Sequence, residues 1–166
     1  MIVACKAERQ LIKVQKFQLL TQIRMELRSR LERLSKAAYE AHAAATDPGS
    51  KAEGKYDTRS LEASYLAAGQ ARQVDELAEA VRIFEACDLP SFTGDDEIDA
   101  GALVAVELDG ANAFFLLVPT SGGMTIKHDG VEITLLTPAS GLYQKLLGMR
   151  IGESLDSPKL RVIAVN

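Results

Sequence analysis

Hydrophobic residues between about Glu8 and Thr46 recur at steps of mostly three and four, which is the spacing of one face of a helix. No proline or glycine interrupts this stretch. Its apolar seam has a period near 3.5 and consists of Phe17, Leu20, Leu27, Leu31, Leu34, Ala38, Ala41 and Ala45. Such a helix would span roughly 58 Å at about 1.5 Å per residue. That length predicts a coiled coil rather than an ordinary globular helix.

A second helix is predicted after a break in the chain. Pro48 lacks an N–H group and disfavours helical backbone at Asp47, so Asp47-Pro48-Gly49-Ser50 ends the first helix. The new helical pattern starts near Asp57 or Thr58 and continues to about Ala86, with a seam of Leu61, Tyr65, Ala68, Val74, Leu77, Val81 and Phe84. Because only about ten residues separate the helices, we expect an antiparallel hairpin whose tip lies near residues 47–57.

The periodicity changes to that of strands after the acidic segment that ends at Glu97. Two pairs of apolar runs each flank an Asp-Gly dipeptide, which favours a tight hairpin turn: Ala102–Leu108 with Asn112–Val118, and Met124–His128 with Val131–Leu136. A short helix at about Ser140–Leu147 and a last strand at Leu160–Val165 follow. We therefore predict an α+β protein with two domains. Residues 1–88 form the helical hairpin, and residues 89–166 form a small antiparallel sheet domain with one helix.

Composition separates the same two parts and excludes several functions. Residues 1–87 carry a formal charge of +2 and residues 88–166 a charge of -6. No apolar run approaches the roughly 18–20 residues of a membrane span, and the N-terminus does not have the pattern of a signal peptide, so we expect a cytoplasmic protein with no membrane partner. Two cysteines 82 positions apart and two histidines predict no disulfide framework, no intrinsic metal and no intrinsic cofactor.

The C-terminal stretch Leu136–Leu155 resembles the end of the Gre transcription elongation factors, GreA and GreB. In that family a Ser-Pro-Leu-Gly segment leads into Ala-Leu-Leu-Gly-Lys and then Val-Gly-Asp. Leu146-Leu147-Gly148 and Ile151-Gly152-Glu153 keep this spacing. The resemblance implies an FKBP-like C-terminal domain and a hairpin that enters the secondary channel of RNA polymerase. It also implies a non-enzymatic factor, since any RNA cleavage would be performed by the polymerase.

The resemblance draws attention to acidic residues at the hairpin tip, which in Gre factors help to hold a catalytic Mg²⁺ of the polymerase near the nascent RNA 3′ end. The family pattern Asp-Leu-x-Glu-Asn-Ala-Glu-Tyr aligns with this chain at Ala63 and Tyr65. Its Asp and first Glu positions fall on Thr58 and Leu61, each one residue from an acid. The candidate tip acids are Asp47, Glu53, Asp57 and Glu62.

These acids also have a structural interpretation. Asp57 is a natural helix N-cap, and Glu62 near the first turn suits the helix dipole. Carboxylates are equally the ligands that Mg²⁺ prefers, so a Mg²⁺ shared with the polymerase is the cofactor that the tip would serve.

Two further surfaces are candidates for binding. The first helix is basic, and Arg24, Arg28, Arg33 and Lys36 form a stripe that could face RNA phosphates or an acidic channel rim, or could simply be a solvated face with intrahelical pairs. Leu142 and Tyr143 are candidates for docking on the polymerase, with plain core as the alternative. Prolyl isomerase activity is not expected, because the C-terminal part has few aromatic residues to line a pocket.

Three functions follow from these observations. The first is a bacterial transcription elongation regulator whose coiled coil enters the secondary channel and stimulates cleavage of backtracked RNA. The second is a regulator or inhibitor in the same channel that does not stimulate cleavage, which the out-of-register acids favour. The third is a coiled-coil adaptor that forms a homodimer through its apolar seam and has no affinity for polymerase.

Overall fold

The computed structural model describes residues 15–46 and 59–166. The chain divides into two compact units. The described part of Met1–Ile23 belongs with Ala86–Asn166 in one unit, and Arg24–Glu85 forms the other. The predicted domain boundary at residues 88–89 lies close to the division between Glu85 and Ala86. The start of the first helix, up to Ile23, belongs to the unit that contains the sheet.

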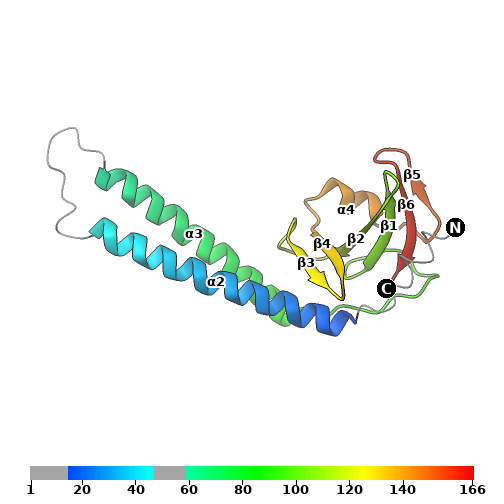
Figure 1. The fold of residues 1–166 in the computed structure, drawn as a ribbon, viewed down its shortest axis with the longest axis horizontal. Helices are drawn as coiled ribbons and strands as arrows, with labels where there is room; N and C mark the ends of the chain where they lie inside the picture. Colours follow the sequence, from blue (N-terminus) through cyan, green and yellow to red (C-terminus); the bar gives the residue numbers. More distant parts are fainter. Residues whose placement is uncertain (1–14, 47–58) are drawn as a thin grey trace. The chain divides into compact units, whose positions relative to one another are not determined.

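Two long helices supply the hairpin (Figure 1). Helix α2 runs from Lys16 to Thr46 and helix α3 from Arg59 to Ala86. Helix α2 begins after Gln15, whose carbonyl accepts from the Leu19 N–H at 3.0 Å, and the predicted helical residues 8–14 lie outside the described part of the chain. The end of α3 at Ala86 agrees with the prediction. Within Arg24–Glu85 the helices run antiparallel, with Arg24 of α2 bonded to the carbonyl of Phe84 in α3.

The buried face of the hairpin differs in part from the predicted seam. Leu20, Leu27, Val81 and Phe84 are buried as predicted, and Leu31, Leu34, Ala38, Ala41, Val74 and Leu77 are half-buried. Phe17, Tyr65 and Ala68 are exposed, so their assignment to the seam was wrong, and Leu19, Ile23 and Ala80 are buried instead. Tyr65 lies nine residues before Val74, which at about 100° per residue places the two side chains on opposite faces of α3.

The C-terminal unit is built on one six-stranded sheet with strand order β3-β4-β2-β1-β6-β5 (Figure 1). Its elements are β1 (Leu103–Leu108), β2 (Ala111–Leu117), β3 (Thr125–His128), β4 (Val131–Leu136), α4 (Gly141–Leu146), β5 (Ser154–Leu155) and β6 (Leu160–Val165). Both predicted hairpins form. Asp109 and Gly110 have φ of 49° and 83°, and Asp129 and Gly130 have φ of 49° and 76°, which is the left-handed pair of residues that a two-residue hairpin turn requires.

The α+β class is confirmed, but the sheet is mixed rather than wholly antiparallel. Strands β2 and β4 pair in parallel, with Phe114 opposite Ile133, while the other strand pairs are antiparallel. The β3–β4 hairpin therefore joins the sheet through its second strand. Strand β5 was not predicted, because two residues are too short to show an alternating pattern.

The core of this unit lies between the sheet and α4. Val104, Phe115 and Leu117 of the sheet pack with Tyr143 and Leu146 of α4 in one buried cluster. Phe114 neighbours Phe115 and points to the opposite face, yet both are only 8% exposed. The central strands are therefore covered on both faces, which explains why β1 is almost continuously apolar.

Candidate functional site

The basic stripe of α2 is divided between contacts to α3 and contacts within α2. Arg24 Nε donates to the Phe84 carbonyl at 2.8 Å and its Nη2 to the Glu85 carbonyl at 3.3 Å. Arg28 donates Nε and Nη2 to Glu85 Oε1 at 3.1 and 2.7 Å. Two of the four predicted basic residues thus hold the last turn of α3.

The other two members of the stripe, Arg33 and Lys36, form no hydrogen bond or ion pair with the described residues of α3. Arg33 donates to the Ser29 hydroxyl at 2.6 Å and lies 3.8 Å from Glu26 Oε1, so it is engaged along its own helix. Glu26 also binds Arg30 at 2.7 Å, and this hydrogen bond lowers the pKa of the Glu26 carboxyl. Lys36 is exposed. The four residues therefore do not act as one uniform cationic surface.

Of the predicted tip acids, the structure describes Glu62. It lies in the first turn of α3 and is exposed, so its charge complements the helix dipole there. Asp47, Glu53 and Asp57 lie outside the described residues. Tyr65, one turn further along α3, is 72% exposed. Glu62 and Tyr65 thus present polar and aromatic groups to solvent near the start of α3.

The predicted docking pair Leu142 and Tyr143 is part of the domain core. Tyr143 is 5% exposed and belongs to the buried cluster, and burial raises the pKa of its hydroxyl. Leu142 is half-buried against the same cluster. Neither residue forms an exposed apolar patch, which agrees with the alternative of plain core.

The Gre-like stretch Leu136–Leu155 forms the end of β4, α4 and β5. Ser140 caps α4 by accepting a hydrogen bond from the Leu142 N–H at 3.3 Å. Gly148 has φ of 77°, and its N–H donates to the Ile98 carbonyl, whose own N–H donates to the Met149 carbonyl, both at 2.8 Å. Gly152 has φ of 90° and donates to the Val162 carbonyl at 2.9 Å. Both glycines of the motif therefore supply backbone that other residues rarely adopt.

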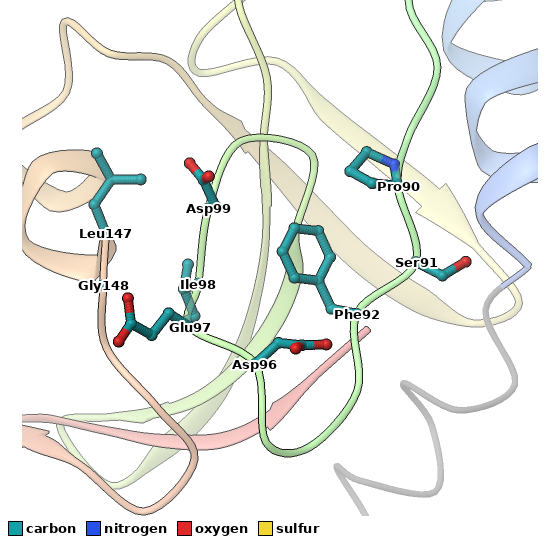
Figure 2. Close-up of a pocket in the computed structure, with 9 residues that line it drawn as sticks. All are labelled: Pro90, Ser91, Phe92, Asp96, Glu97, Ile98, Asp99, Leu147 and Gly148. Carbon is teal, nitrogen blue, oxygen red and sulfur yellow. The ribbon is translucent and has the colours of Figure 1, made fainter.

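A pocket of about 550 Å³ lies beside this stretch. Figure 2 shows the loop that carries Phe92, Asp96, Glu97 and Asp99 facing Leu147 and Gly148. The acids already have partners. Asp96 accepts from the N–H and hydroxyl of Thr93 at 2.7 and 2.8 Å, which lowers the pKa of the Asp96 carboxyl, and Glu97 binds Arg150 at 2.9 Å. With Phe92 as its one aromatic lining residue, the pocket does not provide the aromatic cage expected of a prolyl isomerase.

Sequence analysis missed two residues that fix the first turns of α2 within the sheet unit. Lys16 Nζ donates to the Pro90 carbonyl at 2.5 Å and lies 4.7 Å from the centroid of the Phe92 ring. Burial lowers the pKa of this amine from 10.5 to about 8. Its side chain could not have been paired with residues 74 positions away from local spacing alone.

Gln22 is the second of these residues. Its amide N–H donates to the Lys127 carbonyl at 2.8 Å, and its amide oxygen accepts from His128 Nδ1 at 2.9 Å. His128 is 9% exposed, and its Nε2 has no hydrogen-bond partner among the described residues. The position of Gln22 directly before the apolar Ile23 was the one available sign of this contact.

Neither a metal-binding cluster nor a membrane-spanning helix is found among the described residues. No group of three or more potential ligands among His, Cys, Asp and Glu could hold a metal ion in that part of the chain. None of its helices combines the length and apolarity that a membrane crossing needs.

Among the solved structures that resemble this chain are three of Gfh1. One is GreA factor homolog 1 (Gfh1) of Thermus thermophilus, at 24% identity and a TM-score of 0.34, covering 86% of this chain and 94% of that one. Gfh1 of Thermus aquaticus gives 23% identity, and a further structure of the transcription factor Gfh1 gives 21%, each with a TM-score of 0.34 and covering 86% of this chain and 92% of the other. No family model and no curated protein sequence matches the chain.

Proposed function

We propose that this protein is a regulator of bacterial RNA polymerase that acts through the secondary channel. The observation that carries the proposal is the combination of an antiparallel helix pair with a separate C-terminal sheet unit in which Leu136–Leu155 keeps Gre-like spacing. A pair of helices is a suitable shape for a narrow channel, because it is slender and can carry a charged group at its end. This assignment rests on a likeness of sequence and layout.

The chemistry at the RNA 3′ end would belong to the polymerase. Its active site holds Mg²⁺ that activates water and stabilises the leaving oxygen. The part of this chain would be to present carboxylates: Glu62 in the first turn of α3, together with Asp57, Glu53 and Asp47. The chain would bring no metal of its own.

A second candidate is a factor that occupies the channel without stimulating cleavage. The observation that favours it is the displacement of the acids by one residue from the Gre pattern, at Thr58 and Leu61. One residue on a helix turns a side chain by about 100°, so a displaced carboxylate would point away from the position that the family uses.

The test adds the protein to a stalled, backtracked bacterial polymerase complex and follows the bound fraction and the RNA length together. Shortened RNA supports a cleavage factor, and binding with unshortened or protected RNA supports the second candidate. Absence of binding contradicts both and leaves the homodimeric adaptor, which light scattering would then detect as a stable dimer.

Matched variants connect the effect to the tip. Asp57→Asn and Glu62→Gln remove one charge each near the tip, whereas Asp75→Asn removes one charge from an exposed position further along α3. If Asp57→Asn and Glu62→Gln lose the effect on RNA length while Asp75→Asn keeps it, the tip acids have a role in that effect. Equal loss in all three would contradict it.

A further inference from the structure

The C-terminal end of α3 lacks the residues that usually stabilise such an end. Its last turn contains no basic residue, and Glu85 places negative charge where the helix dipole is already negative. The last four carbonyl groups of any helix also have no partner within the helix. An isolated α3 would therefore fray at Phe84 and Glu85.

Two arginines of α2 satisfy both needs from outside the helix. Arg24 donates to the carbonyls of Phe84 and Glu85, and Arg28 binds the Glu85 carboxylate through two nitrogens at 2.7 and 3.1 Å. Arg24 is half-buried, so its bonds form in a partly desolvated place. We call this set of contacts the arginine clamp.

Leu27, Val81 and Phe84 are buried beside the clamp, but the helix pair beyond them has little that fixes how the helices align along their length. Between Arg28 and Ala43, and between Ala67 and Glu79, every described side chain is half-buried or exposed. Small apolar residues such as Ala38, Ala41 and Ala67 pack almost equally well after a shift of one heptad. Directional polar contacts are what specify register in paired helices.

We propose that Arg24 and Arg28 are positioning residues that set the register of α2 against α3 and thereby the place of the hairpin tip. A shift of one heptad moves one helix by about 10 Å along the other. The functional part of this inference rests on the proposed function, since tip placement matters if the tip acts at the RNA 3′ end. The register itself can be measured without polymerase.

The first measurement is disulfide trapping in a Cys5→Ser/Cys87→Ser background. Leu34 lies ten residues after Arg24, and Val74 lies ten residues before Phe84, so Leu34→Cys with Val74→Cys reports the native register. Leu34→Cys with Ala67→Cys reports a one-heptad shift. We expect Arg24→Ala/Arg28→Ala to lower the ratio of native to shifted crosslink about tenfold. An unchanged ratio, in protein whose circular dichroism is intact, would overturn the proposal.

The control is Arg30→Ala/Arg82→Ala, which removes the same charge from arginines whose ion-pair partners, Glu26 and Glu79, lie on their own helices. It should leave the ratio unchanged. The charge reversal Arg28→Glu should shift the register, and Arg28→Glu/Glu85→Arg should restore it. If the control lowered the crosslink ratio as much as the clamp variant does, or if the double charge reversal did not restore the ratio, a specific register contact would be contradicted.

The second measurement separates binding from positioning on the backtracked complex. The clamp variant should bind polymerase within about twofold of the wild type, while its effect on the RNA 3′ end falls at least about tenfold. Parallel loss of both would mean that the clamp supports folding alone. If the wild-type protein does not bind polymerase, the proposed function fails, and the crosslink ratio still decides whether the clamp sets the register.

Discussion

At the scale of single residues, contacts far apart in sequence decide the local chemistry. Lys16 begins α2, where the helix dipole disfavours a cation, and it is nevertheless held by the Pro90 carbonyl and the Phe92 ring. Its lowered pKa shows that burial outweighs these favourable contacts for the charged form. The amine therefore stabilises the fold less when it is protonated than when it is neutral.

This imbalance predicts a pH dependence of stability. Between pH of about 8 and 10.5 the unfolded chain keeps the Lys16 proton that the folded chain releases, so the free energy of unfolding should rise with pH. Below about pH 8 the amine is protonated in both states and its contribution is constant. Urea unfolding of the wild type and Lys16→Met can be followed by circular dichroism from pH 7 to 10.5. The free energy of unfolding of the wild type should rise with pH relative to that of the variant. A constant difference would contradict the prediction.

Gly101 provides a second residue-scale prediction. Its φ is +86°, and a Cβ atom there would lie 2.5 Å from Pro90 Cδ. Gly110 has a similar φ of +83°, with nothing within 4 Å of its Cβ position. Gly110→Ala should cost about 1–2 kcal/mol for the left-handed backbone alone. Gly101→Ala should cost about 1–3 kcal/mol more for the clash. Equal losses in urea unfolding would show that Pro90 moves away freely.

At the scale of elements, burial in the hairpin falls from its base toward its tip. Leu27 of α2 is 1% exposed and Phe84 of α3 is fully buried, whereas Leu34 and Val74 are half-buried. Two helices alone cannot enclose a side chain on all sides, so each further turn adds little apolar burial. Helices held mainly by weak burial open locally more often than a packed core does.

Paired truncations test this gradient. Leu27→Ala should lower the free energy of unfolding by about 3 kcal/mol, because it leaves a cavity in a closed environment. Leu34→Ala should cost about 1 kcal/mol, because its side chain is already partly in water and the site can relax. Both changes introduce the same residue into α2, so helix propensity cancels between them. Equal costs in urea unfolding would mean that the hairpin is packed uniformly.

The sequence predicted these elements better than it predicted their faces. Asp109-Gly110 and Asp129-Gly130 located two turns because φ > 0 is demanded by the turn itself. The predicted seam of α3 is wrong at Tyr65 and Ala68, which are exposed. Between Ala68 and Val74 no apolar residue lies on the buried face to indicate where that face runs. Parallel pairing of β2 with β4 depends on where the β3–β4 hairpin docks, which no local pattern encodes.

The candidate site was predictable to a smaller extent. Basic residues were correctly located on α2, but the partners of Arg24 and Arg28 lie about 60 positions away. The available sign was on the other helix. The last turn of α3 contains no basic residue and places Glu85 at the negative end of the helix dipole. Leu142 and Tyr143 were ambiguous because an apolar pair on a short helix suits a core as well as a surface.

At the scale of the molecule, the two compact units differ in how they gain stability. The unit containing the sheet holds a closed core in which Val104, Leu117, Ile133 and Leu146 are fully buried. The unit Arg24–Glu85 depends on the base of its helix pair and on the arginine clamp.

The contrast predicts that the chain does not unfold in one step. Circular dichroism at 222 nm, dominated by the long helices, should change at lower urea concentration than backbone amide NMR signals of β1, β2 and β4. Leu27→Ala should move the first transition with little effect on the second, and Ile133→Ala should move the second by about 3 kcal/mol. Each variant serves as the control for the other, because both remove a fully buried branched side chain. If either substitution displaced both transitions equally, the units would unfold as one cooperative body, and the hairpin could not open while the sheet remains intact.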